Sequence, residues 1–192
     1  MKEIRQQKKQ PEVIRKRILE QATILVSQKG ISGVSIQNIA TAVGITKGGV
    51  FHHFPNKKNL IEEMFNQIIL DLDQTVEYLI KRDQTEYGKF TRAYIHSSFI
   101  HQIDGVVSAW SALSMTMITE PTFNKIWMEW LKNRLSQHAE TDSHPDLELL
   151  RLAADGLWLQ SITGVIDDEQ CSKLEDDLLN RTYLIQNLIC EI

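Results

Sequence analysis

The chain of 192 residues is 42% apolar and 24% charged, which is typical of a globular protein with a core of its own, and its net charge is −4. No apolar run reaches the roughly 18 residues that a membrane-spanning helix needs, and no apolar signal-peptide stretch follows the charged N-terminus. We therefore expect a cytoplasmic protein without a membrane partner, in which Cys171 and Cys190 are reduced thiols rather than a disulfide.

The net charge conceals two parts of opposite sign. Residues 1–60 carry 11 lysines and arginines against three glutamates, whereas the remaining residues carry 10 basic and 22 acidic side chains. A basic segment joined to an acidic body indicates a head that binds a polyanion. A basic face that is merely solvated is the alternative that charge alone leaves open.

The first predicted helix has apolar residues three or four positions apart between Ile14 and Leu25. Pro11 suits its first turn, so we expect the helix to begin there. Gly30 suits its end.

Two short helices follow with the same end signals. Ser35 is a good N-cap for the first of them, and Gly44 suits its C-terminus as a left-handed residue. Thr46 is the N-cap of the second, which ends before Pro55. Two short helices joined by a glycine turn form a helix-turn-helix unit.

From Asn56 a long helix leaves the basic head. These patterns predict an all-α fold, in which a basic N-terminal segment with three helices (1–56) is followed by a helical bundle (57–192). Beyond the long helix, the apolar spacing predicts helices over 86–103, 105–119, 122–139, 146–166 and 172–190.

Gly48 and Gly49 stand in the first turn of the third helix, where each costs about 1 kcal/mol of helix stability relative to alanine. In a helix-turn-helix unit the second helix enters the major groove of DNA with its N-terminal residues toward the base edges. A bare backbone at this turn allows close approach to DNA, and Lys47 can reach a phosphate or a guanine. The alternative is that the glycines only loosen a surface turn.

Two cations begin the long helix that follows. Lys57 and Lys58 occupy its first turn, where the helix dipole disfavours positive charge. A DNA phosphate beside this turn would be bound by the lysines and by the free backbone N–H groups together. The placement therefore indicates a functional role.

From Ser35 to Leu60 the sequence SIQNIATAVGITKGGVFHHFPNKKNL resembles the DNA-binding signature of TetR-type bacterial transcriptional regulators. The resemblance implies a homodimeric repressor of about nine helices that binds a palindromic operator in double-stranded DNA. It also implies that residues 1–56 form an N-terminal three-helix DNA-binding domain with a basic arm and that residues 57–192 form a helical ligand-binding and dimerisation bundle. Family members usually carry tyrosine where this chain has Phe51, so a phenolic contact with phosphate is absent, and apolar contact with a thymine methyl is the role left to this ring. The predicted DNA-binding residues are Ser35, Thr46, Lys47, Gly48, Phe51, His52, His53 and Lys57.

No catalytic, metal or cofactor site is expected. His52 and His53 are adjacent, so on a helix their side chains point about 100° apart and cannot chelate one ion together. His96 and His101 are five positions apart, which is also a poor spacing for one helix face. An enzyme is therefore the least favoured class.

The body contains all four tryptophans together with phenylalanine and methionine side chains. Such residues fill the core of any helical bundle, which is one interpretation; sites between helices lined by aromatic and methionine side chains also suit varied apolar ligands. The family resemblance favours a pocket for a small apolar or amphipathic effector. The predicted lining residues are Phe65, Phe99, Trp110, Met117, Trp127 and Trp158.

The segment 147–166 carries two apolar stripes, so one stripe faces the core of its own chain and the other must be covered by something else. Together with the last helix it predicts a symmetric four-helix interface in a homodimer. The predicted interface residues are Leu149, Leu152, Gly156, Leu159, Leu178, Ile185 and Leu188.

We therefore expect a repressor whose DNA affinity falls when an effector binds the body, with the long helix from Asn56 as the connection between the two sites. The alternative is a DNA-binding protein of the same fold without a small-molecule ligand. Such a protein would be controlled by a protein partner or act architecturally.

Overall fold

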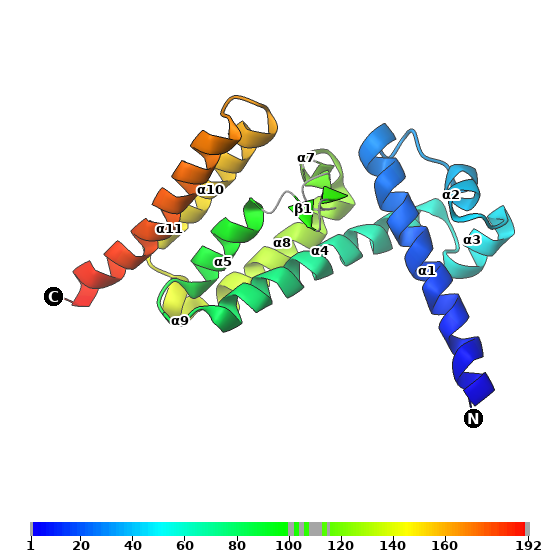
Figure 1. Ribbon diagram of the computed structural model, residues 1–192, viewed down its shortest axis with the longest axis horizontal. Coiled ribbons are helices and arrows are strands. Elements are labelled where there is room, and N and C mark those ends of the chain that lie inside the picture. Colours follow the sequence, from blue (N-terminus) through cyan, green and yellow to red (C-terminus); the bar gives the residue numbers. More distant parts are fainter. Residues whose placement is uncertain (1, 100–101, 104–105, 108–112, 115, 191–192) are drawn as a thin grey trace. The chain divides into compact units, whose positions relative to one another are not determined.

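The computed structural model describes residues 2–99, 102–103, 106–107, 113–114 and 116–190, and the side chains within 11–99, 113–114 and 116–183 (Figure 1). Ten helices lie in this described part, with a hairpin of two strands of two residues each, so the predicted all-α fold is confirmed. The elements are α1 (Lys2–Lys29), α2 (Ile36–Val43), α3 (Lys47–His53), α4 (Lys57–Arg82), α5 (Lys89–Ser98), β1 (Gln102–Ile103), β2 (Val106–Val107), α7 (Thr116–Thr119), α8 (Pro121–Gln137), α9 (Ala139–Asp142), α10 (Pro145–Ile162) and α11 (Asp168–Cys190).

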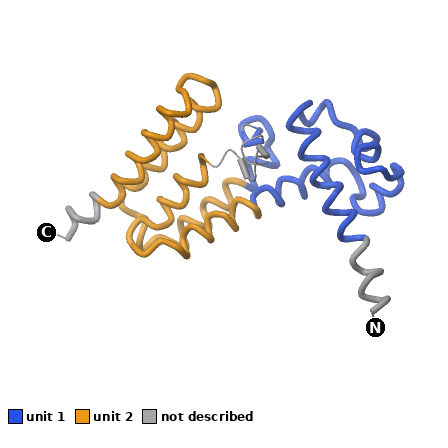
Figure 2. Tube along the Cα trace, in the orientation of Figure 1, with its two compact units in different colours: residues 1–69, 112–126 blue, residues 70–111, 127–192 orange. Residues whose placement is uncertain are grey.

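The chain divides into two compact units (Figure 2). Unit 1 consists of Met1–Ile69 and Ala112–Ile126, and unit 2 of Leu70–Ser111 and Trp127–Ile192. Helices α4 and α8 each contribute residues to both units. The functional boundary expected between residues 56 and 57 remains a prediction.

The predicted caps of α2 and α3 are confirmed. Ser35 and Asn38 form a capping box, in which the Asn38 amide donates to Ser35 Oγ (3.1 Å) and the Ser35 amide donates to Asn38 Oδ1 (3.0 Å). Gly44 ends α2 in the left-handed region with a φ of 78°, and Thr46 caps α3. The start and stop signals were readable in the sequence because they depend on neighbouring residues alone.

Helix α1 begins earlier than predicted. It runs from Lys2, so Pro11 lies inside the helix and not at its first turn. A proline within a helix removes the hydrogen bond to the carbonyl four residues earlier. The residues before it are mostly lysine, arginine, glutamine and glutamate, which are good helix formers, so a single lost bond does not end the helix.

The prediction of two helices over 86–103 and 105–119 is wrong in the middle of this range. Helix α5 ends at Ser98, and β1 pairs antiparallel with β2 in the register Ile103 opposite Val106. The two intervening residues read Asp-Gly, the dipeptide that favours a two-residue hairpin turn, and the flanks are β-branched.

The core of unit 2 is built by α5, α10 and α11. Ile95 of α5 packs in one cluster with Leu147, Leu150 and Ala154 of α10, and partly buried leucines of α11 pack against it. The other stripe of α10 faces away from this core.

Helix α5 has an unusual N-terminus, because its N-cap is Gly88 and offers no side-chain hydrogen bond. The buried carboxylate of Asp142, at the end of α9, takes over this role: Oδ1 accepts from the Thr91 amide (2.7 Å) and from Thr91 Oγ1 (2.7 Å), and Oδ2 accepts from the Phe90 amide (3.4 Å). The buried Arg151 donates to Thr91 Oγ1 (2.6 Å) and to the Asp142 carbonyl (3.2 Å). The Asp142 carboxylate thus caps α5, and Arg151 connects Thr91 and the Asp142 carbonyl to α10.

We predict that Asp142→Ala lowers the free energy of unfolding by about 2–4 kcal/mol, because buried donors lose their acceptor. Denaturant unfolding of the variant measures this loss. Glu140→Ala, at an exposed position of the same short helix, is the matched control. An Asp142→Ala loss no larger than that of the control would contradict the assigned role.

Candidate nucleic-acid interface

The first turn of α3 is exposed and almost without side chains. The Gly49 amide donates to Thr46 Oγ1 (3.0 Å), which fixes the start of the helix. A Cβ added at Gly48 would meet only Thr46 Oγ1, at 3.8 Å, and Gly48 is not among the glycines with positive φ. Neither packing nor backbone conformation therefore requires a glycine at position 48 in the free protein.

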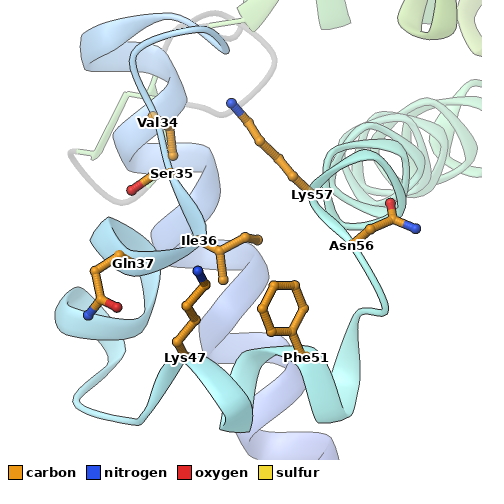
Figure 3. A pocket seen from close by; sticks show the side chains of 8 residues that line it. All are labelled: Val34, Ser35, Ile36, Gln37, Lys47, Phe51, Asn56 and Lys57. Carbon is orange, nitrogen blue, oxygen red and sulfur yellow. The ribbon is translucent and has the colours of Figure 1, made fainter.

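A groove of about 420 Å³ lies beside this turn (Figure 3). Its walls come from α2, α3, the start of α4 and the residues just before α2 and α4, and they combine apolar side chains with two lysines. All of these residues belong to unit 1. The lining residues are Val34, Ser35, Ile36, Gln37, Lys47, Phe51, Asn56 and Lys57.

The ammonium groups of the two lysines in the groove make different contacts. Lys47 is exposed, and its Nζ lies 5.8 Å from the centre of the Phe51 ring, a cation–π contact. Lys57 is half-buried, and its Nζ donates to the Ile31 carbonyl (2.6 Å), which ties the α1–α2 connection to α4. An ammonium group has three N–H donors, so two remain for an anion in the groove.

The histidines of α3 lie edge to face, with ring centres 5.4 Å apart. His52 is exposed, whereas His53 is half-buried. Burial lowers the pKa of His53, and the neighbouring His52 and Arg15 lower it further. Arg15 itself lies over the Phe54 ring and pairs with Glu63 at 2.8 Å.

The structure brings four of the predicted DNA-binding residues, Ser35, Lys47, Phe51 and Lys57, into one groove. The other four are on α3 or cap it: Thr46, Gly48 and His52 are exposed and His53 is half-buried. The groove also includes Gln37 and Asn56, which are not among the predicted DNA-binding residues. The available signal for Gln37 was its place on the polar side of an amphipathic helix.

The residues predicted to line an effector pocket are not gathered in either of the two pockets described in the structure. In unit 1, Phe65 is fully buried and stacks on Phe123 with ring centres 4.3 Å apart, and Met117 lies in α7. Phe99, Trp127 and Trp158 belong to unit 2, and Trp110 lies outside the described residues. Their role as ligand contacts remains a prediction.

The second pocket, of about 580 Å³, lies in unit 2 between α4, α5 and α11 and was not anticipated. It is polar. Arg92, one of its lining residues, is buried and donates to Asp83 (2.6 Å), to the Thr85 carbonyl (2.7 Å) and to Thr182 Oγ1 (3.1 Å).

The two stripes of α10 differ in exposure. Its core-facing stripe is buried, whereas Leu149 and Leu152 are 61% and 59% exposed and Leu159 is also exposed. Gly156 lies on the exposed stripe with nothing within 4 Å of an added Cβ. On α11, Leu178 packs against the core of unit 2, and the side chains of Ile185 and Leu188 lie outside the described residues.

None of the described helices is long and apolar enough to span a membrane. Residues 18–64 match the family described as "Bacterial regulatory proteins, tetR family", and residues 88–183 match "Tetracyclin repressor-like, C-terminal domain". The second match alone covers half of the chain.

The following two relatives are among those that span most of the chain. The "HTH-type transcriptional regulator BetI 1" of Chromohalobacter salexigens is 27% identical over 77% of this chain and 78% of its own length. The "HTH-type transcriptional repressor KstR2" of Mycolicibacterium smegmatis is 28% identical over 78% of each chain. The solved structure of the "multidrug binding protein EbrR complexed with malachite green" has a TM-score of 0.68 at 20% identity, over 88% of this chain and 96% of that one, which shows a shared fold.

Proposed function

The chain belongs to the TetR family of bacterial regulatory proteins, and from this premise we propose that it is a homodimeric repressor of transcription. It is a transcriptional regulator and not an enzyme. In the proposed mechanism it binds a palindromic operator in the cytoplasm and leaves the operator when a small, mostly apolar molecule binds to its body.

The observation that carries the proposal is the pairing of the exposed Gly48, beside which an added Cβ would meet almost nothing, with a groove that holds two lysines. The free backbone N–H groups at the starts of α2, α3 and α4 favour anions, and so do the ammonium groups of Lys47 and Lys57. An apolar wall that includes Phe51 suits the sugar and thymine methyl groups of DNA. A duplex offers phosphates and such apolar groups together.

The exposed leucine stripe of α10 supports a homodimer. A two-fold interface uses the same patch on both subunits, so a continuous apolar stripe is covered by its own copy. With α11 beside α10 in the fold, the two helices supply the four-helix interface expected from the sequence.

The effector is the least constrained part of the proposal. EbrR is named as a multidrug binding protein and was solved with malachite green. The body of this chain contains all four of its tryptophans, which suit an apolar ligand. We propose Phe65, Phe99, Trp110, Met117, Trp127 and Trp158 as effector contacts, with α4 as the connection to the DNA-binding residues. Control by a protein partner is the second candidate, and effector-induced protection against heat unfolding separates the two.

Selection of bound DNA from a random pool tests the function directly. The proposal expects a palindrome whose half-sites are spaced for a dimer. Enrichment of a single unrepeated half-site would contradict the dimeric operator. Absence of any enriched sequence would contradict operator recognition altogether.

We predict that Gly48→Ala leaves the melting temperature equal or higher, since alanine is the better helix former by up to about 1 kcal/mol and meets open space. Operator affinity nevertheless falls, and Gly48→Leu lowers it much further, because the added side chain occupies space that the DNA needs. Gly44→Ala is the control for backbone strain: its φ of 78° predicts lost stability. Lost stability with intact DNA affinity at position 48 would mean that this glycine serves the fold.

We predict that Lys57→Ala weakens binding to all DNA sequences alike and reduces the slope of log affinity against log salt by about 1, as loss of one phosphate contact requires. Titrations at several salt concentrations measure the slope, with Lys173→Ala on α11 as the charge-matched control. A relaxed preference at one base pair with an unchanged slope would make Lys57 a base reader.

We predict that Gly156→Glu weakens the dimer, because it places a charge on the exposed apolar stripe while meeting nothing within its own chain. Sedimentation at graded concentrations measures the dimer constant. Asn133→Glu, at an exposed position of α8, adds the same charge elsewhere. An unchanged dimer constant for Gly156→Glu would show that the interface lies on another surface.

A further inference from the structure

Three carboxamide side chains lie in or beside the groove, and two of them are used to cap helices. Asn38 Oδ1 accepts from the Ser35 amide (3.0 Å) and from Ser35 Oγ (2.7 Å). Asn56 Oδ1 accepts from the Asn59 amide (2.9 Å) at the start of α4. Both are therefore committed to holding the ends of α2 and α4.

Gln37 is the third carboxamide, and its side chain does not cap a helix. Its Nε2 has one long contact, 3.5 Å to Thr41 Oγ1 on the same helix, and no hydrogen bond to Oε1 is found within the described side chains. It is exposed, because α2 buries the face that contains Ile36 and Ile39. Its donor and its acceptor can both turn to a ligand at little cost.

The position of Gln37 places its uncommitted amide group where DNA is proposed to bind. It lines the same groove as Lys47 and Phe51 of α3, as Figure 3 shows. The glycines of the first turn of α3 contribute no side chain to read a base. Within the groove, the lysines only donate and Phe51 forms no hydrogen bond, so none of these can accept the hydrogen bond of a base amino group.

In the major groove of DNA, adenine presents the N6 amino donor beside the N7 acceptor, and a carboxamide matches this pair with two hydrogen bonds. We propose that Gln37 reads an adenine of the operator, with Oε1 accepting from N6 and Nε2 donating to N7. Gln37 is then a specificity-determining residue on α2, beside the readout by α3. This inference rests on the proposed operator binding and names one base-reading contact within it.

The test compares the DNA sequences selected from a random pool by the wild-type dimer, Gln37→Ala and Gln37→Glu, followed by affinity titrations on the selected sites. The wild type prefers adenine over other bases at one position of each half-site by about 5- to 150-fold, the range of a good bidentate contact. Gln37→Ala loses the preference at that position alone. Gln37→Glu changes it from adenine to cytosine, because a carboxylate accepts from the cytosine amino group.

Gln28→Ala, at an exposed position of α1, is the matched control and keeps the wild-type preference throughout. The inference is overturned if Gln37→Ala retains every base preference of the wild type. It is equally overturned if the variant weakens all sequences alike and lowers the salt slope, since that result identifies a phosphate contact. Failure of the wild type to select any sequence is a different outcome, because it overturns the proposed function together with this contact.

Discussion

The hydrogen bond from the Gly49 amide to Thr46 Oγ1 fixes the first turn of a helix that has little else to stabilise it. Helix α3 has seven residues, too few for an isolated helix in water, and two of them are glycines. An N-cap contributes about 1 kcal/mol, similar to the cost of one glycine. Burial of Val50 within α3 and of Phe54 at its end supplies the rest of the anchoring. Because the anchoring lies at the cap and on the inner face, the exposed position 48 in the first turn needs no side chain.

The helices around α3 are also fixed at their starts by side-chain caps. The capping box at Ser35 starts α2, and the side chain of Asn56 caps α4, so the three helices begin beside one groove. Lys57 adds a bond across this arrangement by holding the Ile31 carbonyl. Within unit 2, Asp73 of α4 has a comparable role, since its Oδ1 accepts from Trp130 Nε1 (2.5 Å) and from Arg134 Nε (2.8 Å) on α8. In the proposed mechanism the first turn of α4 faces DNA. Further along the same helix, Asp73 is hydrogen-bonded to α8 in the body.

The sequence was informative wherever the cause of a structure lies within a few residues. The caps Ser35, Gly44 and Thr46 are local, and the two stripes of α10 follow from spacing alone. Contacts made across the fold were not predictable in this way: nothing near Gly88 indicates that Asp142, some 50 residues later, caps α5. The hairpin differs from these, because its Asp-Gly signal is local, but the prediction of helices over 86–103 and 105–119 rested on apolar spacing alone. Gln37 became a candidate only after the structure showed which neighbouring carboxamides are engaged in caps.

Hydrogen–deuterium exchange with and without the selected operator tests whether the start of α3 is a DNA-contacting surface. Backbone N–H groups in the first turn of a helix have no intrahelical acceptor, so those of Lys47 and Gly48 exchange quickly in the free protein. The account predicts that operator DNA slows exchange within 46–51 and 56–60. Unchanged exchange in both segments at saturating operator would contradict it.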